Sequence, residues 1–450
     1  MTALSRASGW RKSWMLLAVF GVLSLIATAC GVEDDVAVDE VDDDIVDEPA
    51  DEPEEEPEVD EDVDEPAEPA DDAIVIGHVN ALEGPFAAGA EDGSRAVELA
   101  LQEFDYEING RPIEVIVESS DTTPDTAVER ARKLVEQDGV DIVYGPLSGS
   151  EGVAISQYAA GVPDVTFVDA SSGGAETTLE GPDNYFRFTA AGDQQGGNFG
   201  TYAYEELGIE RVAIVAEDYA FPHALAGSFI TQFCEAGGEV TEAFWVPLGE
   251  SDYSSVIASM PTDVDAIYGG IGGSDAVNFL QQSIEFGLEI PLIGGSILVD
   301  ETVLAAEGAD LRDAVEDIVA AAPVFADEDN AEWVDFEERY HAEFPDGFET
   351  PSLFAALYYN SFKSLLHALE EVGGDLDDGH EGLRNALSTV AWDTPIGPID
   401  GVDENNQGAV SNFIFQVVEG DDGELTTELL RRDDGIEQHP EPFERLDGCP

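Results

Sequence analysis

The sequence predicts an α/β protein with two lobes, each built on a largely parallel sheet. From residue 73 onward, short apolar runs alternate with segments whose apolar residues repeat every three or four positions. This alternation is typical of strand-helix-strand units. It restarts at residue 211 after a break, which predicts a second lobe, and 450 residues are enough for two hydrophobic cores.

The elements of the first lobe follow in chain order. Apolar runs of strand length predict strands buried in a covered sheet, and they lie at 73–79, 111–121, 140–145 and 164–168. Segments 93–104 and 123–139 carry one apolar face at helical spacing and predict helices between the strands.

The second lobe repeats this order. Strands are predicted at 211–218, 239–247, 264–273 and 290–297, with helical patterns between them. A long helix is expected over 352–374. Near the end, 411–430 predicts a β-hairpin whose turn contains residues 420–423, "GDDG".

The first 30 residues predict a secretion signal with a lipid attachment site. A basic stretch precedes the apolar run "MLLAVFGVLSLIA", and the small residues of "TAC" end it at Cys30. This ending resembles the bacterial lipoprotein signal, in which cleavage precedes the cysteine and a lipid is attached to it. The apolar run is short for a membrane span. We therefore expect an extracytoplasmic protein, lipid-anchored to the cell membrane.

Acidic residues dominate the rest of the chain. Residues 33–72 contain 24 Asp or Glu and neither Lys nor Arg, so 31–72 is predicted to be a disordered tether. Residues 73–450 keep 75 acidic and 14 basic side chains, a formal charge of −61. This charge excludes nucleic acid as a partner. It also predicts halophilic adaptation, because salt screens the self-repulsion of the compact state.

Two cysteines remain after Cys30, namely Cys234 and Cys449. Outside the cytoplasm such a pair can close a disulfide. Without geometry, the sequence leaves open whether they pair or stay free thiols.

Five segments in this order resemble the type I periplasmic solute-binding proteins, specifically the branched-chain amino-acid-binding family that feeds ABC importers. The first and longest are "IVIGHVNALEGPFAAGAEDGSRAVELALQEF" and "GRPIEVIVESSDTTPDTAVERARKLVEQDGVDIVYGPLSGS". The others are "YFRFTAAGDQQGG", "VDAIYGGIGGSDAVNFLQQSIEFGL" and "TPIGPIDGVDENNQ". Together the likeness runs from about residue 73 to about residue 425.

This resemblance implies two Rossmann-like lobes joined by three crossovers, with a ligand cleft between them that closes on binding. Lobe 1 would comprise 73–191 and 323–395, lobe 2 would comprise 192–322 and 396–446, and 447–450 would form a tail. The expected partners are a small polar solute and an ABC permease in the membrane. We expect a monomer without metal or organic cofactor.

Two serines at strand ends are candidate contacts for a ligand carboxylate. Ser150 follows the strand "DIVYG" where a helix begins, and Ser172 follows the next strand in "DASSGGAE". Ligands of α/β sheets sit beyond the carboxyl ends of strands, where helix N-termini offer free N–H groups. In the family, both positions contact the ligand. Each serine also has a plainer interpretation as a helix N-cap.

The resemblance also implies contacts from four other residues. Asp193 lies near the position that holds a ligand ammonium group, Tyr219 or Phe221 near the aromatic that covers the ligand from lobe 2, and Phe86 in the loop that borders the cleft. The alternatives are a helix cap for Asp193 and core packing for the aromatic residues.

Two positions depart from the amino-acid-binding pattern. Ser296 stands where relatives often carry an acidic residue that holds the amino group, and Ile271 stands where they often carry an aromatic. A ligand ammonium group would therefore have less support here. Candidate ligands include branched-chain or related amino acids, amides, urea and carboxylates.

The sequence disfavours other classes of function to different degrees. An enzyme is disfavoured because "GGIGGSD" has Asp275 where a dinucleotide fingerprint needs its third glycine, and the histidines show no metal-ligand spacing. The ligand-binding component of a sensory system is the main alternative, and a structural surface lipoprotein is another.

The excess of acidic side chains generates a prediction about salt. We expect residues 73–450 to be less stable in dilute buffer than in concentrated salt, because screening weakens the repulsion among the acidic residues. Thermal unfolding followed at several KCl concentrations measures this, with sucrose as a control for non-ionic stabilisation. An unfolding midpoint that is the same at very low and very high ionic strength would refute halophilic adaptation.

Overall fold

The computed structural model describes residues 72–306, 308–420 and 425–450. The predicted signal peptide, the lipidated Cys30, the acidic tether up to residue 71 and the hairpin turn at 421–423 lie outside the described residues. Over the described ranges, none of the helices has both the length and the apolar character that a membrane span requires.

Lobe 1 is a six-stranded sheet in the order β2-β3-β1-β4-β5-β6, parallel except for the β2–β3 pair. Its strands are β1 (Ile74–Asn80), β2 (Glu107–Ile108), β3 (Arg111–Ser119), β4 (Ile142–Tyr144), β5 (Thr166–Val168) and β6 (Tyr185–Phe186). Because β1 is buried along its whole length, helices must cover both faces of this sheet.

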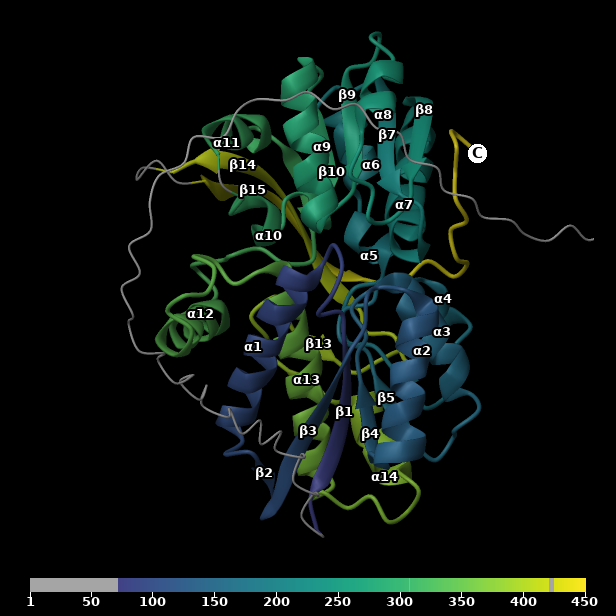
Figure 1. The fold of residues 1–450 in the computed structure, drawn as a ribbon, viewed down its shortest axis with the longest axis vertical. Helices are drawn as coiled ribbons and strands as arrows, with labels where there is room; N and C mark the ends of the chain where they lie inside the picture. Colours follow the sequence, from purple (N-terminus) through teal and green to yellow (C-terminus); the bar gives the residue numbers. More distant parts are fainter. Residues whose placement is uncertain (1–71, 307, 421–424) are drawn as a thin grey trace, which may run out of the picture. The chain divides into compact units, whose positions relative to one another are not determined.

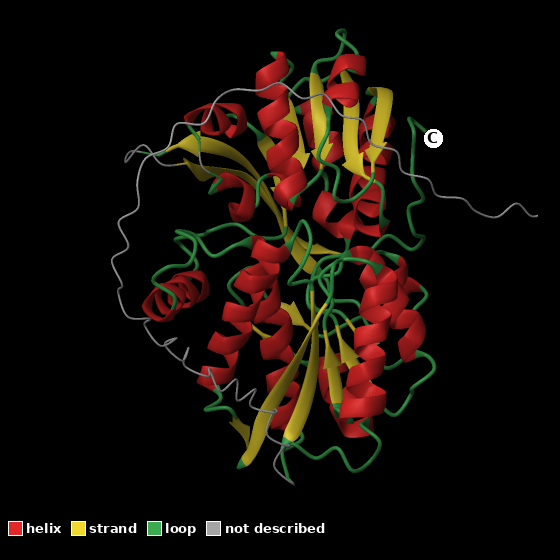
Figure 2. Ribbon diagram, in the orientation of Figure 1, coloured by secondary structure: helices red, strands yellow, loops and turns green. Residues whose placement is uncertain are grey.

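The helices of lobe 1 divide between the two faces, as Figure 1 shows, and Figure 2 separates the helices from the strands by colour. One face carries α1 (Ala87–Glu103), α12 (Ala331–Glu343), α13 (Leu353–Glu371) and α14 (Glu381–Thr389). The other carries α2 (Pro124–Lys133), α3 (Gly149–Ala159) and α4 (Glu176–Leu179). The predicted long helix is α13, the central apolar helix of this lobe, with most of its side chains buried.

Lobe 2 is a seven-stranded sheet in the order β15-β14-β11-β10-β9-β7-β8. Five of its strands are parallel: β7 (Arg211–Glu217), β8 (Glu239–Val246), β9 (Ala266–Gly270), β10 (Leu292–Gly295) and β11 (Val319–Ala322). The hairpin of β14 (Val410–Glu419) and β15 (Leu425–Ile436) extends this sheet in antiparallel fashion. The predicted pairing of this hairpin is confirmed.

Helices also cover both faces of lobe 2. They are α5 (Gly192–Gly196), α6 (Phe199–Glu205) and α7 (Ala220–Ala236) on one side, and α8 (Ser254–Ser259), α9 (Gly273–Phe286), α10 (Glu301–Leu304) and α11 (Ala309–Val315) on the other. The predicted fold class, two α/β lobes of the periplasmic binding protein type I, is confirmed.

The chain passes between the lobes three times, after β6, after β11 and before β14. Near the third passage a small sheet pairs β12 (Ala391–Trp392) with β13 (Ile399–Asp400). The residue boundaries given above for the lobes stay a prediction. The start of α1 differs from the sequence prediction, because the helix begins at Ala87 and takes in part of the expected loop.

Arg187 joins the first and third crossovers. Its buried guanidinium donates from Nε to Gln407 and from Nη1 to the carbonyls of Ser172 and Gly174, at 2.8 and 2.7 Å. Nη2 donates to the Thr178 hydroxyl at 3.0 Å. These bonds fix the loop after β5 relative to the third crossover, which leads into β14. They also give the buried guanidinium charge several hydrogen-bond acceptors.

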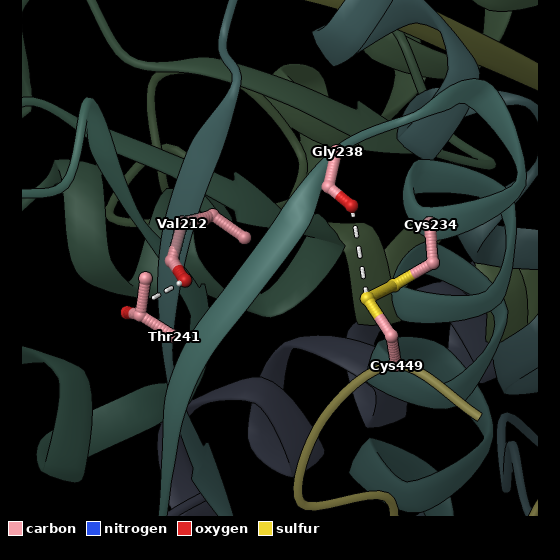
Figure 3. The surroundings of a disulfide bond; sticks show 5 residues. All are labelled: Val212, Cys234, Gly238, Thr241 and Cys449. Carbon is pink, nitrogen blue, oxygen red and sulfur yellow. Dashed lines mark hydrogen bonds between the residues drawn. A yellow bond between two sulfur atoms is a disulfide. The ribbon is translucent and has the colours of Figure 1, made fainter.

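The C-terminal segment runs from lobe 1 to lobe 2. Gln438 bonds Thr178 and the Ala175 carbonyl in lobe 1, and Cys449 then forms a disulfide with Cys234 at the end of α7. Figure 3 shows this bridge beside Gly238. The structure thus pairs the two cysteines that the sequence left open.

The disulfide generates a prediction about stability. Its partners are 215 residues apart, so the bond restricts a long loop of the unfolded chain. We expect the double variant Cys234→Ser and Cys449→Ser to lose about 2–4 kcal/mol of unfolding free energy. Urea unfolding at constant high salt measures this. A reducing agent should lower the wild-type midpoint and leave that of the double variant in place; an equal midpoint for oxidised and reduced wild type would contradict the prediction.

Candidate functional site

A small cavity of about 20 Å³ lies between the lobes, beyond the carboxyl ends of their strands. This is the place where open α/β sheets bind ligands. Lobe 1 contributes Phe86, Leu147, Gly149, Ser171, Gly173, Leu353, Phe354 and Leu357, and lobe 2 with its crossover contributes Gln195, Tyr219, Phe221 and Ile297. Its walls are therefore mainly apolar, with aromatic rings from both lobes.

A larger hollow of about 420 Å³ is lined by residues that include Glu301, Arg312 and Glu349. None of the sequence-predicted site residues is among those that line it. The small cavity between the strand ends is therefore the better candidate for the ligand site.

Three of the predicted contacts, Phe86, Tyr219 and Phe221, line this cavity together. Phe86 follows β1 and meets Phe354 of α13 edge to face, with ring centroids 5.8 Å apart. Tyr219 and Phe221 follow β7, with their centroids 6.4 Å apart. The cleft thus has aromatic walls on both sides, and the role of each ring as a ligand contact stays a prediction.

Glycines of lobe 1 make room for Phe221 of lobe 2. A Cβ atom added at Gly149 would lie 2.8 Å from the Phe221 Cβ and 2.7 Å from its backbone nitrogen. One added at Gly173 would lie 2.8 Å from a ring carbon of the same residue. Real Cβ atoms do not approach so closely, so the glycine-rich strand ends permit the lobes to meet in this arrangement.

Ser150 lies in the first turn of α3 and faces lobe 2. Its hydroxyl oxygen accepts a hydrogen bond of 3.1 Å from the backbone N–H of Ala220, the first residue of α7. Ser150 is not among the residues that line the small cavity, although its neighbour Gly149 is, and its hydroxyl joins the two lobes directly. Its contact with a ligand carboxylate stays a prediction.

Ser172 is fully buried and turned into lobe 1. Its hydroxyl donates to the Asp169 carboxylate, and its N–H donates to the same group at 2.7 Å. Tyr185 also donates to Asp169, at 2.7 Å. Burial nevertheless raises the pKa of Asp169 to about 6, and the nearby Arg187 lowers it only in part. Ser171, which the sequence analysis missed, lines the cavity instead.

Asp193 does not line the cavity. It lies in α5 at the first crossover, 6% exposed, and its Oδ2 accepts a 2.6 Å hydrogen bond from the His439 N–H of the C-terminal segment. Burial raises its pKa, opposed by that hydrogen bond and by Arg187. Its predicted contact with a ligand ammonium group stays a prediction.

Ile271 and Ser296, the two positions that depart from the amino-acid-binding pattern, lie in different surroundings. Ile271 is fully buried in the core of lobe 2. Ser296 follows β10 and donates its hydroxyl hydrogen to the side-chain carbonyl of Gln195. The Gln195 amide donates in turn to the Ala190 carbonyl at 3.1 Å. A neutral hydrogen-bonded pair thus occupies the position where the resemblance stated above would imply an acid.

Gln195 reaches the cavity wall and escaped the sequence analysis. It contacts Ser296, which lies 101 residues away in the sequence, so no local pattern links the two. The sequence "GDQQGG" directed attention to Asp193, whereas the structure places Gln195 at the cleft.

A buried acidic pair lies behind the lobe 2 wall. Glu217 is fully buried, and its Oε1 accepts from the Gly272 N–H at 3.3 Å. Burial first, and then the neighbouring charge of Asp275, raises the pKa of Glu217 well above its ordinary value. Burial and this neighbouring charge therefore favour the protonated, uncharged form of the group.

The described part of the chain holds no cluster of three or more His, Cys, Asp or Glu placed to bind a metal ion. The one histidine on β1, His78, is buried against Tyr144. Burial lowers its pKa to about 3. The imidazole is therefore neutral at ordinary pH and packs as part of the core.

Comparisons with known proteins agree with this geometry. The profile of the periplasmic binding protein family matches residues 73–424. Leu/Ile/Val-binding protein homolog 7 of Brucella abortus (strain 2308) is 25% identical over 382 residues, which is 80% of this chain and 92% of the relative.

Two solved structures are similar over the same region. An ABC transporter substrate-binding protein from Sphaerobacter thermophilus has 26% identity and a TM-score of 0.73, covering 82% of this chain and 100% of that one. A solute binding protein of an ABC transporter from Rhodopseudomonas palustris BisB5, in complex with 3,4-dihydroxy benzoic acid, has 26% identity and a TM-score of 0.74, covering 82% of this chain and 99% of that one.

Glu151, in the first turn of α3, generates a prediction about pH. Burial raises its pKa to about 7, although the Ser148 N–H donates to it at 3.1 Å. An acid with a raised folded pKa stabilises the fold at low pH, and that contribution is lost as pH rises from its unfolded pKa through its folded one. We therefore expect unfolding free energy to fall by up to about 3 kcal/mol for this group between about pH 5 and about pH 8.

The variant Glu151→Gln keeps an acceptor for Ser148 and removes the titration, so its stability should fall less over this range than that of the wild type. Urea unfolding at both pH values and fixed salt measures the difference. Glu129→Gln, an exposed acid on α2, is the matched control and should follow the wild type. Equal pH dependence in wild type and Glu151→Gln would contradict the assignment.

Proposed function

The chain belongs to the periplasmic binding protein family, and on that premise we propose that it is the solute-binding component of an ABC importer. It would capture a small solute outside the cytoplasm by lobe closure and deliver it to a membrane permease. The solute would leave chemically unchanged, because the role needs binding and release without bond chemistry.

The observation that carries the ligand proposal is the lining of the cleft. Its twelve residues include four aromatic rings and neither an acidic nor a basic side chain. Apolar walls with a few polar groups favour a ligand with an apolar body and one polar end. We propose a carboxylate without an amino group, whose ring or alkyl chain packs between Phe86 and Phe221.

The carboxylate would lie at the N-terminus of α3, where backbone N–H groups and the positive end of the helix dipole favour an anion. Ser150 stands at this end, and its hydroxyl would turn from Ala220 to the ligand as the lobes part. Gln195 and Ser171 would supply the remaining polar contacts from the opposite wall and the neighbouring loop.

A branched-chain amino acid is the second candidate ligand, because curated relatives are named as Leu/Ile/Val-binding protein homologs. Its ammonium group would need an acid in the cleft. Asp193 is the sequence-predicted one, and it would have to exchange the His439 N–H for the ligand. The neutral pair of Ser296 and Gln195 favours the carboxylate over this alternative.

The size of the cavity indicates how the ligand enters. About 20 Å³ holds roughly one water molecule. A solute of several heavy atoms can enter only when the lobes separate, and it would take the space that side chains such as Phe221 fill here. Closure around the solute is the signal that a permease would recognise.

The setting of this function follows from the N-terminal sequence. We propose that residues 1–30 are a signal peptide, that Cys30 carries the lipid, and that the acidic tether spaces the binding lobes from the membrane surface. A ligand-binding component of a sensory system would share this anchoring, and it would need a signalling partner in place of a permease.

A ligand screen by thermal unfolding in high salt tests the proposal. Benzoate, 3,4-dihydroxybenzoate, short alkyl carboxylates, leucine, isoleucine, valine, short amides and urea form the panel. A compound at about 100 times its dissociation constant adds about 2.7 kcal/mol, which is a shift of a few degrees. We expect the aromatic or alkyl carboxylates to give the largest shift.

The variant Phe221→Ala should reduce that shift, because the ring forms the lobe 2 wall of the cleft. Phe286→Ala, at an aromatic residue of α9 that is 58% exposed, is the control and should bind as the wild type does. A shift with branched-chain amino acids alone would replace the proposed ligand by the second candidate. If no compound shifts the transition, the solute-binding proposal for these ligand classes fails.

A further inference from the structure

Among the described residues, three hydrogen bonds join the lobes across the cleft, apart from those of the crossovers and of the C-terminal segment. The Ala220 N–H donates to Ser150, the Ser274 N–H donates to the Pro85 carbonyl at 3.1 Å, and the Leu353 N–H donates to Oδ1 of Asp300 at 2.8 Å. The first two join neutral groups, whereas the third ends on a carboxylate. Burial raises the pKa of Asp300, and its hydrogen bonds from Thr302 and Leu353 oppose this change. In its ionised form the group makes hydrogen bonds about twice as strong as neutral ones.

Hydrogen bonds within lobe 2 orient the Asp300 side chain for this contact. It precedes α10 in lobe 2 and is 4% exposed. Its Oδ2 accepts from the N–H of Thr302 at 3.2 Å and from the hydroxyl of the same residue. Because Thr302 holds Oδ2 inside lobe 2, the side chain is already ordered, and Oδ1 faces lobe 1.

The group that Asp300 reaches is the first N–H of α13, a 19-residue helix of lobe 1. First-turn N–H groups have no acceptor within their own helix, and the positive end of the helix dipole favours a carboxylate there. When the lobes separate, Leu353 loses this acceptor and Asp300 loses this donor. The contact therefore exists only in the closed arrangement.

A second carboxylate at the same helix end belongs wholly to lobe 1. Asp92 of α1 accepts from the Ser352 N–H at 3.0 Å and forms an ion pair with Arg95 at 2.9 Å. These bonds do not depend on closure. The N-terminus of α13 thus carries one permanent acceptor and one that lobe 2 supplies on closing.

We propose that Asp300 is a positioning residue for solute capture, which latches lobe 2 onto the N-terminus of α13 when the cleft closes. This inference rests on the proposed function, because a latch matters only if closure retains a solute. It predicts that Asp300 slows the release of the solute and has little part in its first encounter with the open cleft.

Hydrogen exchange tests the contact without any ligand. In the full chain in high salt, Asp300→Ala should speed exchange of the Leu353 amide about tenfold or more, whereas the Ser352 amide, held by Asp92, should be unchanged. Asp300→Asn keeps an acceptor oxygen and should lie between the two. Glu301→Gln, which removes the adjacent acid, is the matched control. Equal exchange of Leu353 in wild type and Asp300→Ala would overturn the latch.

Binding kinetics test the role, with benzoate and isoleucine as the probes. For either probe that binds, Asp300→Ala should raise the dissociation rate constant about tenfold and leave the association rate constant within about twofold. A purely structural residue would not split the two rates in this way. Faster exchange at Leu353 without faster dissociation would overturn the latch. If neither probe binds, the proposed ligand classes fail, and faster exchange at Leu353 with unchanged exchange at Ser352 still supports the contact on which the latch depends.

Discussion

The arrangement of the cleft depends on the buried guanidinium of Arg187. It donates to the carbonyls of Ser172 and Gly174, to Thr178 and to Gln407, and so joins the loop after β5 to the third crossover. Burial lowers the pKa of Arg187, and the neighbouring Asp169 opposes this change. Removing this side chain would leave two carbonyls without their donor and the hinge without its link. The network thereby fixes the loop that carries Ser171 and Gly173, two residues of the cavity wall.

The sequence predicts the lobes well because hydrophobic periodicity and chain order carry that information. It predicts the strand ends that form the cleft for the same reason, and Phe86, Tyr219 and Phe221 meet there. Side-chain direction is another matter. Ser172 and Ser171 are neighbours, and a buried aspartate three residues before Ser172 turns its hydroxyl away from the cavity. Asp193 is drawn to a C-terminal segment 246 residues away. No local sequence pattern contains such contacts. Alignment with a family therefore locates the loop that borders the cleft, but it does not show which side chain of that loop faces the ligand.

The acidic residues form two groups, one exposed at the surface and one buried, and salt and pH affect the two groups differently. Most lie on the surface, where their repulsion is screened by salt. A few are buried around the cleft, among them Glu151, Asp169 and Glu217, and burial raises their pKa values. The buried acids are least costly when protonated, so they favour mildly acidic solution, whereas the surface acids favour concentrated salt. Both effects favour the compact state: protonation removes charge from the buried acids, and salt screens the repulsion among the surface acids.

The contacts in the closed cleft indicate which chemical class of solute it favours. Phe221 already packs against the glycines of lobe 1, and Ser150 already has a donor in Ala220. A solute that enters the cleft must displace both contacts and replace what they contribute. Urea offers hydrogen bonds but little apolar surface, so it would leave the aromatic walls poorly packed. A carboxylate with a ring or alkyl body can replace the Phe221 packing with its body. Its oxygens can accept from the Ser150 hydroxyl and from the Ala220 N–H that Ser150 would release at the N-terminus of α3. The cleft therefore favours solutes whose apolar and anionic ends are as far apart as Phe221 and Ser150.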